Sequence, residues 1–531
     1  MLSWHLIAVI GTAVATPFPE MPQPTLDWWQ TAVIYHIYPR SFKDSNGDGI
    51  GDLKGIIERF GHIKDLGVGA IWLSPIYPSP NADFGYDISN FTDVDPAFGT
   101  LGDFDNLVSL AKENDVKIIM DFVPNHSSDE HDWFLKSLHK IDPYTDFYTW
   151  HDGKLDESGN RIPPNNWVSI FNSQSMLGEG SAWSWRDERK QFYLHQFQPK
   201  QPDLNYRNAA VVEEMKNVLR FWLDRGVDGF RVDSVQFLFE GPVNVSDGEK
   251  QAQQILSKTV DMVAQWRKVL DHKSAESENN KVLLVEVHRE SDNVTAFYGN
   301  STVPVAHLHL NFRLFHLHGG PTARDVSNTI NNYMDLMIGE RWPNWVLGSH
   351  DQHRVASRLG AHLVDAMNIL AMLLPGVAVT YYGEEIGMEN TYVTWEQCRD
   401  VRGVHSGSDR YLERTRDLER APFHWDNTTS AGFSSNSSTW LPLNNQYKNL
   451  SLAQQRREMK SHYKVYKQLM DLRKTRTIQH GNYEVAAVND NVLVVSRYSR
   501  CRLLGFIYGH TLLHCNQSKR TPNQKASASA D

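Results

Sequence analysis

Short runs of β-branched and aromatic residues alternate with longer amphipathic stretches through most of this chain, and this alternation limits its fold more than any other feature. Strands that alternate with helices predict βαβ units and a parallel sheet. About eight such units occur in about 370 residues, which favours a closed (β/α)8 TIM barrel with insertions over an open sheet. The expected strands are 32–38, 69–73, 117–123, 229–233, 282–286, a sixth near 307–309, 345–348 and 377–382, with helices at 103–114, 209–225 and 365–374 between them.

The length of 531 residues predicts more than one domain, because a single hydrophobic core stops growing at about 250–300 residues. We assign the catalytic barrel to residues 28–126 and 202–462. Residues 127–201, rich in Trp, Pro, Asn and Ser, form the longest interruption and predict a subdomain inserted after the third strand. The alternation in Val485–Arg497 predicts a small, truncated C-terminal β-domain over 463–498, followed by a divergent tail over 499–531.

The first residues are typical of a secretory leader. Leu6–Val14 is apolar but too short to span a bilayer, and Ala13-Val14-Ala15 fits the small-x-small cleavage pattern, so we expect residues 1–15 to be a signal peptide. An uncleaved anchor is the alternative, because no Lys or Arg precedes the apolar run. No later stretch has the apolar length of a transmembrane helix, so the sequence predicts a secreted protein. Asn-x-Ser/Thr sequons agree with an extracellular glycoprotein, and they include Asn244, Asn293, Asn300, Asn427, Asn436 and Asn449.

Charge and cysteine content exclude two classes of protein. A net charge of −10 and a pI near 6.1 argue against a nucleic-acid partner, since nucleic-acid binders are usually basic. Three cysteines (Cys398, Cys501 and Cys515) cannot all pair within the chain, so a disulfide scaffold is excluded as well.

Polar side chains terminate several of the expected apolar strands. Asp121 and His126 follow the third strand, Arg231 and Asp233 close the fourth, Glu286 ends the fifth, and His350 and Asp351 follow the seventh. Active sites of barrels of this kind lie at the C-terminal ends of the strands, so these side chains are expected on one rim. Two or three carboxylates in one cleft indicate cleavage of a glycosidic bond, with one acting as nucleophile or base and a protonated one as acid. A nearby Arg keeps the nucleophile ionised.

These segments resemble the four signature regions of the family 13 (α-amylase-type) glycoside hydrolases. Gln201-Pro-Asp-Leu-Asn205 resembles the extra signature of the oligo-1,6-glucosidase and α-glucosidase branch. The opening Trp28-Trp29 and Ile34–Phe42, with the leader and the sequons, look most like the secreted insect maltases. The four regions, which occur in the expected order on the expected strands, are Asp121-Phe-Val-Pro-Asn125-His126, Gly229-Phe-Arg231-Val-Asp233, Glu286 in Leu-Leu-Val-Glu-Val, and His350-Asp351.

The resemblance implies a role for each matching residue. Asp233 would be the nucleophile, Glu286 the general acid/base, and Asp351 a third carboxylate that holds sugar hydroxyls. Family members retain the anomeric configuration, so the carboxyls of Asp233 and Glu286 should lie about 5–5.5 Å apart. Asn125 falls inside the catalytic motif, and we expect its sequon to be unmodified. The residues that would bind the sugar are His126, Arg231 and His350, with Tyr86 as stacking platform and Asp83 and Arg420 at the non-reducing end, where closure makes the enzyme exo-acting.

The loop from Asp44 to Asp52 is rich in oxygen donors. It begins like an EF-hand, but Gly55 stands where a bidentate Glu is required, so an EF-hand is not supported. Similar family members bind one structural Ca²⁺ in this loop, and a solvated Asx/Gly turn is the alternative. No organic cofactor is expected, and zinc is not favoured at His307, His309, His316 and His318, because no Cys or carboxylate spacing completes a site. The calcium ligands implied by the resemblance are Asp44, Asn46, Asp48, the Ile50 carbonyl and Asp52.

Several positions bear on specificity. Ser234 follows the nucleophile; in this branch Val there accompanies α-1,6 linkages and smaller residues accompany α-1,4, so we expect activity on maltose, short malto-oligosaccharides and, as a further candidate, sucrose. Departures from the family pattern occur at Ser349, at His353, in the loop Cys398–Ser408 and after Tyr498. The resemblance thus implies a secreted, exo-acting, retaining α-glucosidase with a small sugar substrate. A glucosyl-transferring relative and a non-catalytic ectodomain, as in transporter subunits or receptors, are the alternatives.

Overall fold

The computed structural model describes residues 7–11, 25–171, 180–241, 243, 253–277, 279–287, 292–499 and 502–508. Its centre is a sheet of eight parallel strands in the order β12-β11-β10-β4-β3-β2-β14-β13. This order confirms the predicted TIM barrel, and the strand bounds differ from the predicted ones by only a few residues. The strands are β2 (Val33–Ile37), β3 (Ala70–Leu73), β4 (Lys117–Phe122), β10 (Gly229–Val232), β11 (Val282–Val285), β12 (Leu308–His309), β13 (Asn344–Val346) and β14 (Val377–Tyr381).

The two end strands of this sheet, β12 and β13, are joined by side-chain amides. Asn344 Nδ2 donates to the His309 carbonyl at 2.6 Å, and Asn344 Oδ1 accepts from the Asn311 amide at 2.8 Å. Asn311 Nδ2 in turn donates to the Asn344 carbonyl at 3.1 Å. Since both asparagines are buried, these bonds close the barrel where the backbone ladder stops.

Alternate residues of each strand face two different cores, which explains why the strands read as continuous apolar runs. Inside the barrel, Ile34, Trp72 and Ile119 pack together with side chains of the other strands. Their neighbours in sequence, such as Tyr35 and Ile71, belong to the larger core between strands and helices.

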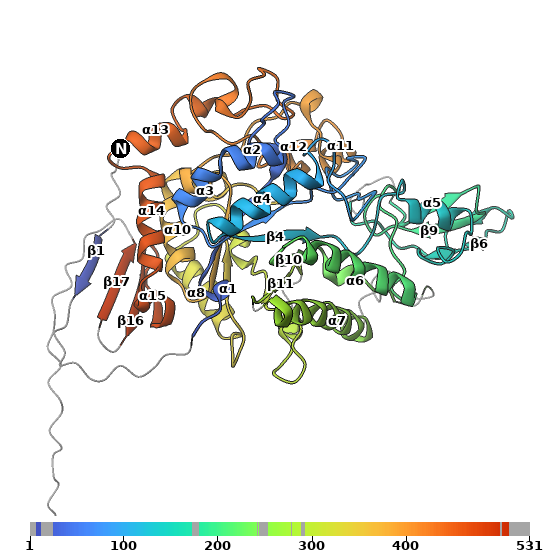
Figure 1. Cartoon of the computed structure of the whole chain (residues 1–531), viewed down its shortest axis with the longest axis horizontal. Coiled ribbons are helices and arrows are strands. Elements are labelled where there is room, and N and C mark those ends of the chain that lie inside the picture. The colour runs from blue at the N-terminus through green and yellow to red at the C-terminus, as the bar shows by residue number, and fades with distance from the viewer. Residues whose placement is uncertain are drawn as a thin grey trace, which may run out of the picture.

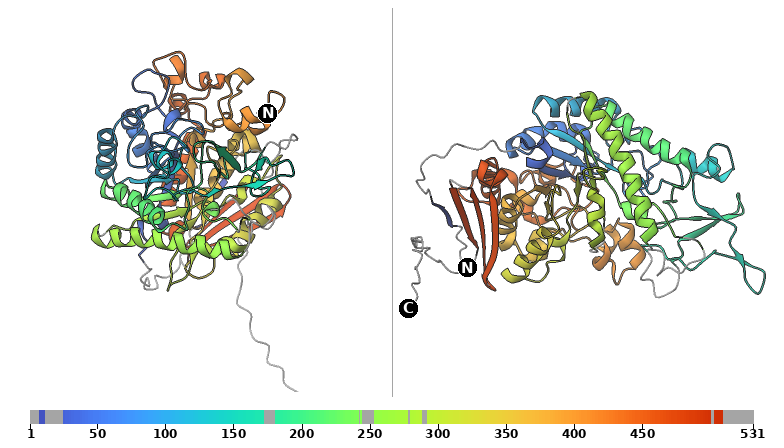
Figure 2. Two further views of the ribbon diagram at one scale, coloured as in Figure 1. Left: turned by 90° about the vertical axis from the view of Figure 1, so that its right-hand side faces the viewer. Right: turned by 90° about the horizontal axis from the view of Figure 1, so that it is seen from below.

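Helices surround the sheet, as Figures 1 and 2 show. Their starts follow ordinary capping rules: Thr100 and Asp103 form a capping box at α4, and Thr322 and Asp325 form another at α8. The helices are α1 (Trp28–Thr31), α2 (Leu53–Glu58), α3 (Phe60–Leu66), α4 (Leu101–Glu113), α5 (Asp132–Leu138), α6 (Ala209–Asp224), α7 (Gln253–Ser277), α8 (Ala323–Met334), α9 (Val355–Leu359), α10 (Val364–Leu373), α11 (Val401–Ser406), α12 (Tyr411–Arg414), α13 (Leu452–Arg457), α14 (His462–Arg473) and α15 (Arg476–His480). None of the helices in the described part of the chain has the length and apolar character to cross a membrane.

The segment between β4 and β10 forms small antiparallel sheets of its own, at the right of Figure 1. Trp167, Trp183 and Phe192 make a separate apolar cluster there, so the aromatic residues of this insertion serve its own core. Its strands are β5 (Trp150–His151), β6 (Lys154–Leu155), β7 (Arg161–Ile162), β8 (Trp183–Arg186) and β9 (Gln191–Leu194).

A four-stranded antiparallel sheet lies at the opposite side of the barrel (Figure 1), in the order β1-β17-β16-β15. Its strands are β15 (Asn482–Asn489), β16 (Val492–Ser499), β17 (Arg502–Tyr508) and β1 (Ile7–Gly11). The sheet therefore extends past residue 498, where we expected the C-terminal β-domain to end, and β17 lies in the predicted tail. Strand β1 lies within the segment predicted as leader, and the rest of the tail, from residue 509, lies outside the described residues.

Candidate active site

The C-terminal ends of neighbouring strands bring the predicted polar residues together. Arg231 on β10 pairs in register with Asp121 on β4, and Asp233 directly follows β10. Glu286 directly follows β11, the other neighbour of β10. His350 and Asp351 follow β13. All these side chains therefore lie at one end of the barrel, as predicted.

The guanidinium of Arg231 joins three carboxylates at this rim. Its Nη1 lies 2.7 Å from Asp121 Oδ1 and 2.8 Å from Asp233 Oδ1, and its Nη2 lies 2.5 Å from Glu286 Oε2. All four side chains are buried. One cation thus holds the two predicted catalytic carboxyls through its two terminal nitrogens.

The protonation states of the three carboxyls depend on their sharing a single buried cation. Burial raises the pKa of Asp233, and the Arg231 guanidinium opposes this effect while the carboxyl of Glu286 adds to it. Burial likewise raises the pKa of Asp121 to about 6, again against Arg231. Neighbouring carboxyls that share one cation do not all ionise near neutral pH. The cluster can therefore keep both an ionised carboxylate and a proton, as acid–base chemistry requires.

The backbone after Asp233 is unusual. Ser234 has φ 42° and ψ 42°, a left-handed conformation that is uncommon for residues other than glycine. Its amide donates to Glu286 Oε2 at 3.2 Å. The turn at Ser234 thus provides Glu286 with a second donor besides Arg231.

Tyr86 and His350 form an aromatic wall beside these acids. Their rings are parallel to within 7°, with centroids 5.3 Å apart, and the Tyr86 hydroxyl lies 2.7 Å from His350 Nε2. Burial lowers the pKa of His350 to about 3, so the imidazole is neutral at physiological pH. Asp351 Oδ2 lies 3.5 Å from the same Nε2.

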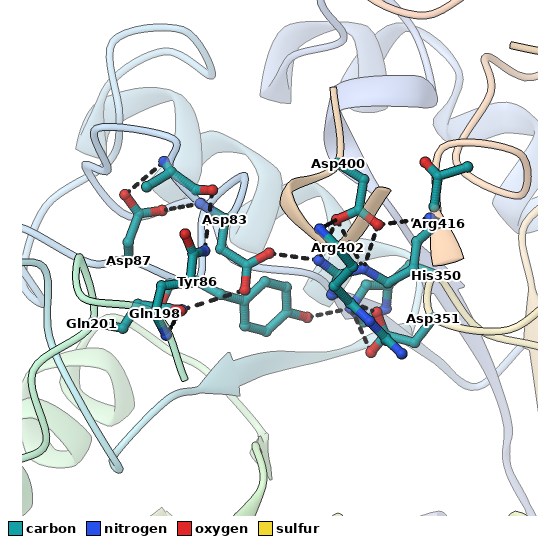
Figure 3. A network of polar contacts seen from close by, with 12 residues as sticks. Asp83, Tyr86, Asp87, Gln198, Gln201, His350, Asp351, Asp400, Arg402 and Arg416 are labelled. Atoms are coloured by element: carbon teal, nitrogen blue, oxygen red, sulfur yellow. Dashed lines mark hydrogen bonds and ion pairs between the residues drawn. The ribbon is translucent and has the colours of Figure 1, made fainter. Parts of the chain in front are cut away.

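Asp83 is paired with Arg416 (Figure 3), whereas Arg420, which was expected with Asp83 at the non-reducing end of the sugar, binds Asp351. Arg416 Nη2 lies 2.7 Å from Asp83 Oδ1, and its Nη1 lies 3.1 Å from Asp351 Oδ1. Arg420 instead donates from Nη2 to Asp351 Oδ1 at 2.8 Å and from Nε to the His350 carbonyl at 2.7 Å. The two arginines lie four residues apart in the same segment, and of these two only Arg416 contacts Asp83.

Asp351 is an ionised carboxylate in this arrangement. Burial acts to raise its pKa, but the nearby guanidinium groups of Arg416 and Arg420 oppose that effect, and the pKa lies well below its usual range. Because Oδ1 accepts from both guanidinia, Oδ2 is the oxygen with acceptor capacity to spare.

His126 contacts the backbone of Tyr86. Its Nε2 is 3.0 Å from the Tyr86 carbonyl and 3.1 Å from Gln201 Nε2, and burial lowers its pKa to about 4. Gln201 also donates to Asp83 Oδ2 at 3.3 Å, so the Gln201 signature contributes a side chain to the site. Asn125 is 1% exposed, which leaves no room for a glycan at its sequon.

The predicted calcium loop is a turn with many internal hydrogen bonds. Asp44 accepts four of them, from the amides of Asn46, Gly47 and Gly49 and from the Ser434 hydroxyl, which fills its carboxylate. Asp48 accepts two and Asp52 three, so both keep an acceptor position. Oxygen donors suit Ca²⁺ in kind, but Asp44 does not fit a ligand's role without losing a bond. Within the described ranges no three His, Cys, Asp or Glu side chains are grouped to hold a metal.

Comparison with known proteins agrees with this geometry. The family model described as "Alpha amylase, catalytic domain" matches residues 36–481. The chain belongs to the α-amylase family. Among members of this family, a salivary alpha-glucosidase of Anopheles gambiae is 44% identical, over 91% of this chain and 83% of that protein. An alpha-glucosidase of Apis mellifera is 45% identical, over 92% of this chain and 85% of that protein. A trehalulose synthase crystal structure from Pseudomonas mesoacidophila superposes with a TM-score of 0.81 at 31% identity, covering 92% of this chain and 91% of that one.

Proposed function

We propose that this α-amylase family member is a secreted, exo-acting α-glucosidase that releases terminal glucose from maltose and short malto-oligosaccharides, with sucrose as a further substrate. The observation that carries the proposal is the binding of Asp233 and Glu286 to the two terminal nitrogens of the Arg231 guanidinium, with the ionised Asp351 at the same rim. The relatives from Anopheles gambiae and Apis mellifera are both named alpha-glucosidases, which supports this proposal.

Two displacements complete the proposed reaction. The reactive form of the cluster has its proton on Glu286 and leaves Asp233 ionised beside Arg231. The Asp233 carboxylate attacks the anomeric carbon while Glu286 gives its proton to the glycosidic oxygen, so the bond to the leaving sugar breaks and a glucosyl ester forms. Glu286 then takes a proton from water, the water oxygen attacks the same carbon, and the Asp233 carboxylate leaves. Two inversions give net retention, and α-glucose is the product.

The remaining residues would hold the glucose unit. Asp351 would accept from sugar hydroxyls through Oδ2, while His126 and His350, both neutral, would hydrogen-bond the ring substituents beside the Tyr86 platform. The ion pair of Asp83 and Arg416 would bound the pocket beyond one glucose unit, which is what makes the enzyme exo-acting.

Transfer of glucose to a second sugar is the other candidate function. It is favoured by the trehalulose synthase neighbour, which shares the fold over most of both chains. Analysis of initial products at high sucrose separates the two, because only transfer yields isomeric or larger saccharides.

Secretion is proposed from the leader-like residues 1–15 and from the salivary relative. It predicts that the mature protein lacks these residues, which N-terminal sequencing of protein from the medium would check.

The decisive experiment measures glucose release from maltose by the wild type and by Asp233→Asn. Asp228→Asn is a matched control, because Asp228 is a buried aspartate whose carboxylate binds Lys281 at 3.0 Å just before β10, at the other end of that strand. We expect activity to vanish in Asp233→Asn and to survive in Asp228→Asn. A folded wild type without activity, shown by a cooperative melt, would overturn the proposal in favour of a binding role.

A further inference from the structure

The segment Cys398–Ser408 departs from the family pattern, yet it delivers a fully buried carboxylate to the glucose pocket. Asp400 is 0% exposed and lies at the N-terminal end of α11. Its backbone is fixed by Asp417, whose Oδ2 accepts from the amides of Arg399 at 2.6 Å and Asp400 at 2.9 Å. Asp417, which follows α12, therefore fixes the backbone that carries the Asp400 side chain.

Both carboxylate oxygens of Asp400 bind Arg416, and Oδ1 also accepts from the Arg402 amide at 3.5 Å as the N-cap of α11. Arg416 Nε lies 3.1 Å from each oxygen, Nη2 lies 2.5 Å from Oδ1, and the Arg416 amide donates to Oδ2 at 2.7 Å. A guanidinium held at two nitrogens by a planar carboxylate has a fixed plane and direction. Figure 3 shows Arg416 among Asp400, Asp83 and Asp351, with its contacts drawn as dashed lines.

The bond to Asp400 decides where the rest of the guanidinium can lie. Nη2 is shared between Asp400 and Asp83, and Nη1 binds Asp351 at 3.1 Å. Arg416 is therefore the only described cation that bridges the carboxylates of Asp83 and Asp351. An arginine side chain has many rotamers, and without its anchor it would lose much of this orientation.

The charges agree with such an anchor. Arg416 faces three carboxylates, which together outweigh burial and raise its pKa well above the usual value. The same guanidinium outweighs the burial of Asp400 and lowers the pKa of that carboxyl. Both groups are ionised, so the contact between them is a charged pair shielded from water.

We infer that Asp400 is a positioning residue for glucose recognition: it orients Arg416 so that one guanidinium bridges Asp83 and Asp351 at the closed end of the pocket. Asp400 itself does not contact the acids of the Arg231 cluster. Its loss should therefore weaken binding of the terminal glucose more than it slows bond cleavage. The inference rests on the proposed α-glucosidase function.

The test compares Asp400→Asn with wild type in maltose hydrolysis. The asparagine keeps the size and one carbonyl oxygen but removes the charge. We expect the KM for maltose to rise by about tenfold or more, with a smaller fall in kcat, as for loss of one partner of a buried charged pair. Inhibition by free D-glucose should weaken by a similar factor. Asp228→Asn, which removes a buried charge away from the site, should lower the melting temperature and leave KM unchanged.

A double-mutant cycle tests whether Asp400 affects KM through Arg416. Arg416→Lys and Asp400→Asn should each raise KM, and the double variant should resemble Arg416→Lys alone, because both changes remove the same contact. An Asp400→Asn enzyme with a lowered melting temperature but wild-type KM and glucose inhibition would show a purely structural role and overturn the inference. Additive effects would overturn it as well. Inactive but folded wild type would overturn the proposed function and this inference together.

Discussion

The Tyr86 hydroxyl lies between His350 Nε2, at 2.7 Å, and Asp121 Oδ2, at 2.8 Å. A hydroxyl has one hydrogen, so when Tyr86 donates to the Asp121 carboxylate it must accept from His350. We therefore assign the neutral His350 as the tautomer with hydrogen on Nε2. The Tyr86 phenol thus connects the Arg231 cluster to His350.

Tyr86→Phe keeps the ring but leaves His350 and Asp121 each without this partner. We expect kcat/KM for maltose to fall by about tenfold and the free energy of unfolding by about 1–3 kcal/mol, the cost of unpaired buried polar groups. Steady-state kinetics and urea unfolding check both. Tyr206→Phe is the control, because Tyr206 is also buried and its hydroxyl bonds only the Pro124 carbonyl at 2.8 Å. Equal catalytic losses in the two variants would contradict the assignment.

Ser234→Val tests linkage choice at a strained position. A β-branched residue at φ 42° costs about 1–3 kcal/mol, so the melting temperature should fall. The ratio of kcat/KM for isomaltose to that for maltose should rise, because the resemblance associates Val here with α-1,6 linkages. Wild type should prefer maltose, and Ser234→Ala should keep that preference. A wild type that prefers isomaltose would contradict the specificity proposed for Ser234.

Glu384 predicts a distinct dependence of stability on pH. Burial raises the pKa of Glu384 to about 8, and its Oε2 accepts from the Tyr381 amide at 2.9 Å. A folded-state pKa above the unfolded value of about 4.3 means that the folded protein binds the extra proton, so this stability is complete below pH 4 and is lost as the pH rises through 8. The slope is at most about 1.4 kcal/mol per pH unit. Glu384→Gln should flatten the fall in melting temperature between pH 5 and 9 relative to wild type, and parallel profiles would contradict the assignment.

Calcium at the loop from Asp44 to Asp52 remains a proposal taken from the family resemblance. If the ion binds, Asp44 must exchange one of its four hydrogen bonds for it, while Asp48 and Asp52 have acceptor positions to offer. We expect EDTA to lower the melting temperature and Ca²⁺, but not Mg²⁺, to restore it, because a ligand that binds only the folded state stabilises it. A melting temperature indifferent to EDTA would identify the loop as a hydrogen-bonded turn.

The sequence predicted the barrel and the rim residues because each signal was local. A polar residue that ends an apolar strand, such as Asp233 or Glu286, has its place set by the strand. Which arginine reaches Asp83 could not be predicted from local sequence. Arg416 and Arg420 lie four residues apart after the same loop, and only the packing of that loop decides which of them contacts Asp83. The role of Asp400 was not predicted, because its contact with Arg416 also depends on packing and its segment does not match the family pattern.

The bonds between β12 and β13 escaped prediction for another reason. Asparagine is depleted in strands, so Asn344 and Asn311 gave no strand signal, although both are buried and bond across the gap. The C-terminal boundary near 498 was set by loss of resemblance, and β17 shows that strand pairing continues without it.

The seam between β12 and β13, where asparagine side chains replace the backbone ladder, is expected to be the weakest junction of the barrel. Every other pair of neighbouring strands must break a backbone ladder to separate, whereas β12 and β13 need release only a few amide contacts. Opening there would turn a cylinder into a sheet with two bare edges, the form most prone to join other chains. The first event in heat inactivation is therefore expected at this seam, and amide hydrogens beside Asn344 and Asn311 should exchange with solvent sooner than those of the β3–β4 pair on the far side of the barrel.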